Sequence, residues 1–126
     1  MSKNEIAEKA VMYKHSGYNC AQAVVKALSE AEGVDDSMLL AQTAGFAVGM
    51  GNMESTCGAL IGANMMAGIK TSGNGTIAKS RELHKHFSEN CGASICKDLK
   101  GRDTGVMVCE CDDCVRNAVY AFADIL

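Results

Sequence analysis

Apolar residues recur at helical spacing along most of this chain, and that pattern limits its fold more than any other feature. One helix face is indicated by four residues at the i, i+3, i+4, i+7 positions: Ala21, Val24, Val25 and Leu28. The last segment carries the cleanest stripe: Val115, Ala118, Val119, Phe122 and Leu126. No segment alternates polar and apolar residues for long enough to indicate a strand, and the chain contains no proline to interrupt a helix. These patterns predict an all-α protein.

We expect a compact bundle of about five to six helices that forms a single domain over residues 1–126. The first helix should end before Gly17, and the second should run from residue 20 to about Gly33. A short third helix follows Asp35 or Asp36, either of which can act as its N-cap. Further helices are expected at about 57–70, at about 76–88 and at the end of the chain. Three glycines in residues 45–55 predict a glycine-rich loop before the helix at 57–70.

Charge and composition exclude several classes of function. The net charge is −3, the 12 Lys and Arg residues are scattered, and there is no Trp, so the chain lacks the basic and aromatic surface of a nucleic-acid-binding protein. The amino-terminal segment MSKNEIAEKA is too charged for a secretory signal peptide. No apolar segment approaches the roughly 20 residues that cross a bilayer. We therefore expect a cytoplasmic protein without membrane insertion, and its small size makes a homodimer an option.

Seven cysteines are the main chemical feature of the sequence. In a cytoplasmic protein, such a number indicates metal binding or catalysis more than a disulfide framework, and an odd number cannot all pair within one chain. Four predicted helix starts carry a cysteine. Cys20 follows the N-cap candidate Asn19, Cys57 follows Ser55 and Thr56 as cap candidates, and Cys96 begins a short turn. The fourth start, that of the last helix, carries Cys111 and Cys114.

A helix start favours a thiolate, because its free backbone N–H groups and dipole stabilise an anion. We therefore predict lowered thiol pKa values at these positions and a sulfur-lined pocket where the helices converge. Gly58 and Gly62, four residues apart on one helix face, should let another backbone approach the sulfur of Cys57 and thereby contribute to a cofactor-binding surface. The segment CECDDC, residues 109–114, spaces its cysteines so that two or three sulfurs can reach one soft metal. Cys91 can be a spare ligand or a packing residue.

These blocks, taken in order, resemble the C_GCAxxG_C_C family of small bacterial and archaeal redox-active proteins. The matching segments are GYNCAQAV at residues 17–24, GFAVGMGNMESTCGALIGA at 45–63, GASICKDLKG at 92–101 and CDDCV at 111–115. Either Cys111 or Cys114 can be the last cysteine of the family pattern. The resemblance implies a redox or metal-associated role, and a similar domain in split-Soret cytochromes implies an iron–sulfur site. The chain has no C-x-x-C-H segment, so covalent haem attachment is not expected. The family pattern does not include Cys91, Cys109 or one of the Cys111/Cys114 pair. These additional cysteines leave room for a second site.

Three functions follow from these observations. The leading hypothesis is an iron–sulfur protein that transfers electrons to an unidentified redox partner. Its candidate ligands are Cys20, Cys57, Cys96 and Cys114, with Cys111 as the alternate to Cys114. The second is a thiol–disulfide oxidoreductase in which Cys57 is the catalytic nucleophile and another cysteine resolves the mixed disulfide. The third is a binding module for zinc or another soft metal.

Overall fold

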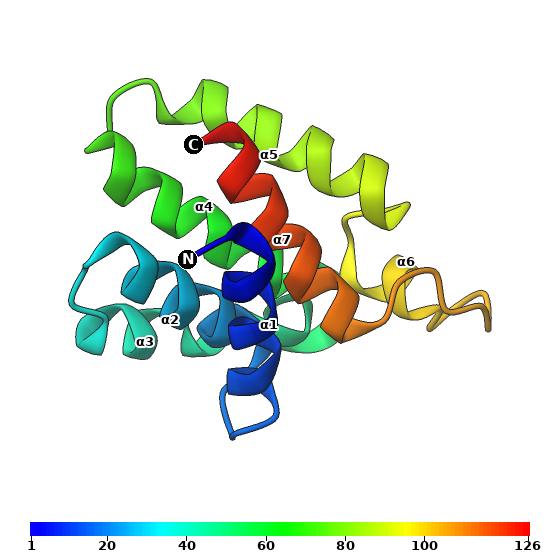
Figure 1. Ribbon diagram of the computed structural model, residues 1–126. Helices are drawn as coiled ribbons and strands as arrows, with labels where there is room; N and C mark the ends of the chain where they lie inside the picture. Colours follow the sequence, from blue (N-terminus) through cyan, green and yellow to red (C-terminus); the bar gives the residue numbers. More distant parts are fainter.

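The computed structural model describes residues 1–126 and contains seven α-helices and no strand (Figure 1). The helices are α1 (Lys3–Lys14), α2 (Cys20–Glu32), α3 (Ser37–Thr43), α4 (Gly58–Thr71), α5 (Thr76–Cys91), α6 (Cys96–Lys100) and α7 (Cys111–Ile125). The predicted all-α class is confirmed. The number of helices is slightly higher than predicted, because the turn expected at Cys96 forms a short helix, α6.

Local capping explains where several helices begin and end. Asn19 accepts a hydrogen bond from the Gln22 N–H at the start of α2, while the Gln22 side chain accepts one from the Asn19 N–H. This reciprocal capping box satisfies two backbone donors that the helix leaves free. Gly33 ends α2 in the left-handed conformation, as expected for glycine at that position.

The predicted cap of α4 is wrong, and the predicted cap of α3 is correct in position only. Neither Ser55 nor Thr56 caps α4, because Cys57 itself occupies the N-cap position and its side chain makes no capping hydrogen bond. Asp36 is the N-cap residue of α3 but makes no such bond either, and the neighbouring Asp35 carboxylate accepts from the Ser37 N–H at 3.0 Å. Residues 55 and 56 are unavailable as caps because an extended backbone pairing, described below, holds them.

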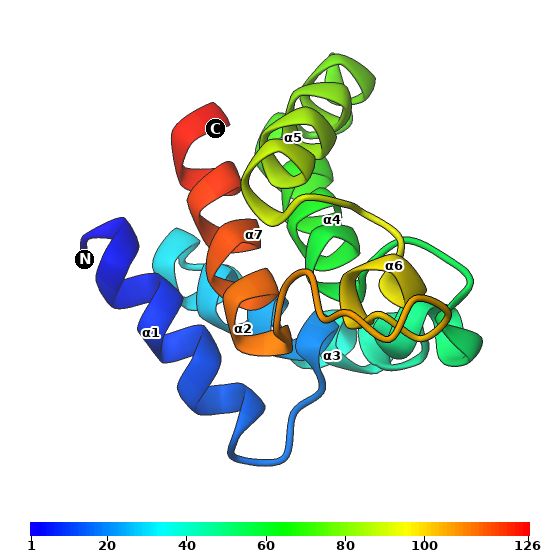
Figure 2. The same cartoon turned by 90° about the vertical axis from the view of Figure 1, so that its right-hand side faces the viewer.

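One continuous cluster of buried apolar side chains joins the helices. Helices α2, α4 and α7 pack against one another, α1 covers α2 and α7, and α5 covers α4 and α7. Figure 2 shows the first turns of α6 and α7 at the same end of the bundle as the start of α2. The bundle thus brings helix starts from distant parts of the sequence to one place.

Close packing of α2 on α4 depends on Gly62. A Cβ atom at this position would lie 2.8 Å from the Ala21 carbonyl oxygen and 3.3 Å from the Val24 Cβ. Because only glycine leaves this space, the two helix backbones approach closely next to Cys20 and Cys57. No helix of the structure is both long enough and apolar enough to span a bilayer.

Candidate metal centre

Five cysteines line one cavity of about 330 Å³ at this end of the bundle. They are Cys20, Cys57, Cys96, Cys111 and Cys114. These are the five metal-ligand candidates named from the sequence, and the structure brings all of them together. Of the two glycines assigned to the cofactor-binding surface, Gly58 lines the cavity, whereas Gly62 acts one turn away in helix packing.

Four of these cysteines lie at separate helix starts, as predicted. Cys20, Cys96 and Cys111 are the first residues of α2, α6 and α7, and Cys57 is the N-cap of α4. Cys114 lies in the first turn of α7. Cys57, Cys96 and Cys114 are buried, while Cys20 and Cys111 are half-buried. The cavity therefore has a buried side and a side closer to solvent.

Main-chain hydrogen bonds fix Cys57 relative to Cys96. The Cys57 N–H donates to the Ser94 carbonyl at 2.8 Å, and the Cys96 N–H donates to the Ser55 carbonyl at 3.0 Å. Together these bonds form an isolated antiparallel bridge between Thr56 and Ile95. Backbone pairing, in addition to side-chain packing, therefore sets the distance between Cys57 and Cys96.

The glycine-rich segment closes one wall of the cavity. Gly49 has a positive φ of 56°, and a Cβ atom there would lie 2.7 Å from the Cys96 Cβ. At Gly58, a Cβ atom would lie 3.0 Å from the Cys20 sulfur and 2.8 Å from the Phe46 carbonyl oxygen. The two glycines therefore allow the backbone to lie directly against Cys96 and Cys20.

The predicted lowering of thiol pKa values is wrong for four cavity cysteines of the protein without metal, namely Cys20, Cys57, Cys96 and Cys114. A hydrogen bond to Cys114 and burial raise the pKa of Cys57, although the N–H groups of Ala59 and Leu60 oppose this effect. Burial and the neighbouring Cys57 raise the pKa of Cys20, and the same two causes raise the pKa of Cys96. Helix-start donors are present, but desolvation and adjacent sulfurs outweigh them.

Lys100 brings a positive charge to the sulfurs. Its Nζ lies 3.5 Å from the Cys114 sulfur and donates to the Cys109 carbonyl at 3.0 Å. Burial alone would lower the pKa of Lys100, but the adjacent Cys114 and Cys111 sulfurs outweigh burial and raise it. Lys100 is therefore protonated and can balance thiolate charge in a metal-bound state. Sequence reasoning missed this residue, since a lysine in GASICKDLKG gives no sign of being half-buried.

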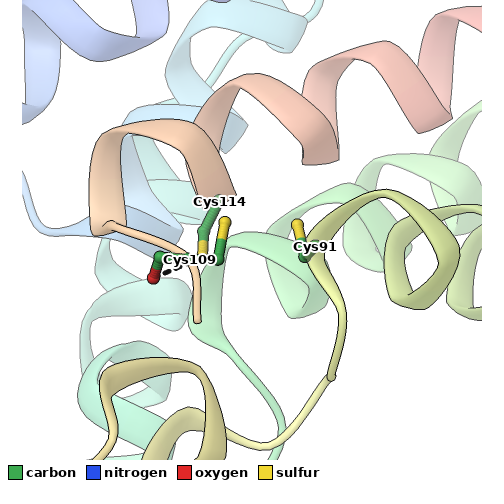
Figure 3. A group of neighbouring side chains, drawn as sticks. All are labelled: Cys91, Cys109 and Cys114. Atoms are coloured by element: carbon green, nitrogen blue, oxygen red, sulfur yellow. Dashed lines mark hydrogen bonds between the residues drawn. The ribbon is translucent and has the colours of Figure 1, made fainter. Parts of the chain in front are cut away.

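A second group of sulfurs lies beside the cavity (Figure 3). It consists of three buried cysteines: Cys91 at the end of α5, Cys109 in the loop before α7 and Cys114 on α7. Their sulfurs all lie within 4.8 Å of one another. This triad can hold a metal ion. The cysteines of the segment CECDDC therefore do not share one site. Cys109 belongs to the triad, Cys111 lines the cavity, and Cys114 belongs to both.

Comparison with known proteins gives one match. The model of the family described as "Putative redox-active protein (C_GCAxxG_C_C)" matches residues 18–125. No curated protein and no solved structure matches the chain. The family match includes every cysteine of the cavity and the triad. Since it spans most of the sequence and agrees with the cysteine blocks, the chain belongs to the C_GCAxxG_C_C family.

Proposed function

We propose that the cavity binds an iron–sulfur cluster through cysteine thiolates and that the protein transfers single electrons. The observation that carries this proposal is the convergence of five cysteines from four helix starts on one cavity. Four cysteine thiolates are the ordinary ligand set of both [2Fe–2S] and [4Fe–4S] clusters. The membership of a redox-active family supports the same class of function.

Sulfur spacing supports a cluster over a single ion in the cavity. Around one tetrahedral zinc, with Zn–S bonds of about 2.3 Å, the sulfurs lie about 3.8 Å apart. The group of three sulfurs that approaches this spacing is the triad, which contains only Cys114 from the cavity. No three cavity cysteines form such a group. The absence of such a group suits a centre with several metal atoms better than a single zinc ion as the occupant of the cavity.

Metal binding in the cavity would be coupled to the release of protons. Because the pKa values of Cys20, Cys57 and Cys96 are raised, these residues are thiols before metal arrives. Each would have to release its proton in order to act as a thiolate ligand. Lys100 and the backbone N–H groups directed at Cys20 and Cys57 then offset the negative charge of the thiolates.

A cluster held by these cysteines would supply one-electron redox chemistry. A reduced partner would provide the electron, and an oxidised partner would accept it. The apolar wall formed by Ala47, Val48 and Met53 would limit the access of water to the sulfurs. Burial and hydrogen bonds to sulfur are general means by which proteins set cluster potentials.

The test is anaerobic purification and reconstitution, followed by iron and sulfide analysis, absorption and electron paramagnetic resonance. The wild-type protein should contain iron and sulfide and show a cluster spectrum that changes on reduction. Cys20→Ser should lose most of the iron, whereas Cys91→Ser, a matched change outside the cavity, should retain it. Colourless wild-type protein with neither iron nor sulfide after reconstitution would refute the proposal.

Thiol–disulfide exchange is the second candidate, because Cys57 and Cys114 line the same cavity and Cys114 is the main cause of the raised pKa of Cys57. A deprotonated Cys57 would attack a substrate disulfide and release one substrate thiol, and Cys114 would then displace the second. The substrate gains two electrons and two protons, and a Cys57–Cys114 disulfide forms. The raised pKa of Cys57 and its burial weigh against this role. Rapid, selective alkylation of Cys57 near neutral pH in the metal-free protein would favour it, and uniformly slow alkylation would exclude it.

A further inference from the structure

We propose that Cys91, Cys109 and Cys114 form a separate site for one zinc ion beside the cavity. Their sulfurs lie within 4.8 Å of one another, and sulfurs around tetrahedral zinc lie about 3.8 Å apart. Side-chain shifts of about 1 Å therefore suffice to form three Zn–S bonds. The three residues come from separate segments, the end of α5, the loop before α7 and the first turn of α7 (Figure 3).

Neighbouring donors support thiolates at this site. The Asn117 Nδ2 donates to the Cys91 sulfur at 3.2 Å, and the Lys100 Nζ lies 3.5 Å from the Cys114 sulfur. Such outer hydrogen bonds orient metal ligands and stabilise their charge. Lys100 is the last residue of α6, and Asn117 lies on α7, the helix that carries Cys114.

The charge of the site favours a divalent ion. Three thiolates with Zn²⁺ carry one net negative charge, which the Lys100 ammonium balances. Three thiolates with Cu⁺ carry two negative charges and leave one of them unbalanced. Both ions bind thiolate well, so charge balance among these buried sulfurs decides for zinc.

The fourth zinc ligand would be a water molecule. A pocket of about 480 Å³ lies next to the triad, and Cys91, Cys109 and the exposed Glu110 are among the residues that line it. Asp113 also lines this pocket and pairs with Arg116 at 2.8 Å. Water can therefore reach the site from this side, and the nearby Glu110 carboxylate adds to its attraction for a cation.

Assignment of Cys114 to zinc changes the ligand set of the cavity. It leaves Cys20, Cys57, Cys96 and Cys111, one cysteine from each of the four helix starts, which is the number that an iron–sulfur cluster needs. This part of the inference rests on the proposed function of the cavity. The zinc site does not, because its three sulfurs and its donors are independent of what the cavity binds.

Two matched double variants test the site by metal analysis of anaerobically reconstituted protein. Cys91→Ser with Cys109→Ser should lose zinc and retain iron, while Cys20→Ser with Cys96→Ser should retain zinc and lose iron. Cys114→Ser should lose zinc and retain iron. Circular dichroism confirms that each variant is folded. The zinc site would be overturned if the first double variant retained zinc or if the second lost it. It would also be overturned if wild-type protein supplied with zinc bound none.

Zinc X-ray absorption on the wild-type protein provides a test that needs no variant. Three sulfur ligands and one oxygen ligand are expected, whereas four sulfur ligands would overturn the proposed coordination. Cobalt substitution should give sulfur-to-cobalt charge-transfer bands that vanish only when the triad is mutated. Wild-type protein that binds zinc at the triad without iron in the cavity would refute the cluster proposal alone. Iron loss together with zinc loss in folded Cys114→Ser would overturn the exclusive assignment of Cys114 to zinc.

Discussion

Replacement of Gly62 by alanine should weaken the fold, although alanine is the better helix former. In a helix interior, alanine is favoured over glycine by about 1 kcal/mol. At Gly62, however, the new Cβ would lie 2.8 Å from the Ala21 carbonyl oxygen and 3.3 Å from the Val24 Cβ. Overpacking of this kind costs about 1–3 kcal/mol. The free energy of unfolding should thus fall by up to about 2 kcal/mol, with a matching loss of the close approach of α2 to α4.

Gly68 provides the matched control, because it lies in the same helix and an added Cβ would meet no atom within 4 Å. Gly68→Ala should therefore stabilise the protein by about 1 kcal/mol. Urea unfolding of the metal-free proteins at one pH, followed by circular dichroism, measures both variants. The difference between them should be about 1–3 kcal/mol. If Gly62→Ala is as stable as Gly68→Ala, the backbone approach at Gly62 does not limit the packing of α2 on α4.

Three further predictions concern pH, charge and backbone conformation. Because the folded protein raises the pKa of Cys57, that group stabilises the metal-free fold at neutral pH, and its contribution is lost as pH rises. Above about pH 8.5, the unfolding free energy should fall by about 1.4 kcal/mol per pH unit for this thiol, and Cys57→Ser should show a shallower fall in urea titrations. Lys100→Gln removes a positive charge from the lining of the cavity. This substitution should lower the reduction potential of a bound cluster by about 40 mV for each 1 kcal/mol by which the reduced state loses stabilisation. Redox titration measures this shift, and an unchanged potential would contradict the role of this charge. Ser72 ends α4 at a positive φ of 54°, so Ser72→Gly should raise the unfolding free energy by about 0.5–1 kcal/mol in urea, and any decrease would refute this reasoning.

The class of fold and most helix positions could be predicted because they depend on local signals. The apolar stripe before Leu126 and the Asn19 cap act over a few residues, and the structure confirms both. The short helix α6 was predicted only as a turn, since five residues are too few to show helical periodicity. Local capping rules failed at Ser55 and Thr56 because a distant segment, around Ile95, pairs with their backbone.

The cysteines that line the cavity could be predicted from the sequence, whereas their protonation could not. Helix starts identified the cavity cysteines, because their positions follow from local sequence. Their protonation could not be predicted, because the raised pKa of Cys57 depends on burial and on Cys114, which is distant in the sequence. The triad was equally hidden, since Cys91 meets Cys109 and Cys114 only after α5 packs on α7.

The backbone bridge between Thr56 and Ile95 has a consequence for the speed of electron exchange. A redox centre changes its charge with each electron, and ligands that move in response slow the transfer. Cys57 and Cys96 lie on either side of this bridge and are each held by a main-chain hydrogen bond. Two ligands of a cluster at this site would therefore keep their positions in both oxidation states, which lowers the reorganisation energy. Movement would be confined to the half-buried Cys20 and Cys111, and under the proposed function their side of the cavity would then be the route by which metal enters and leaves.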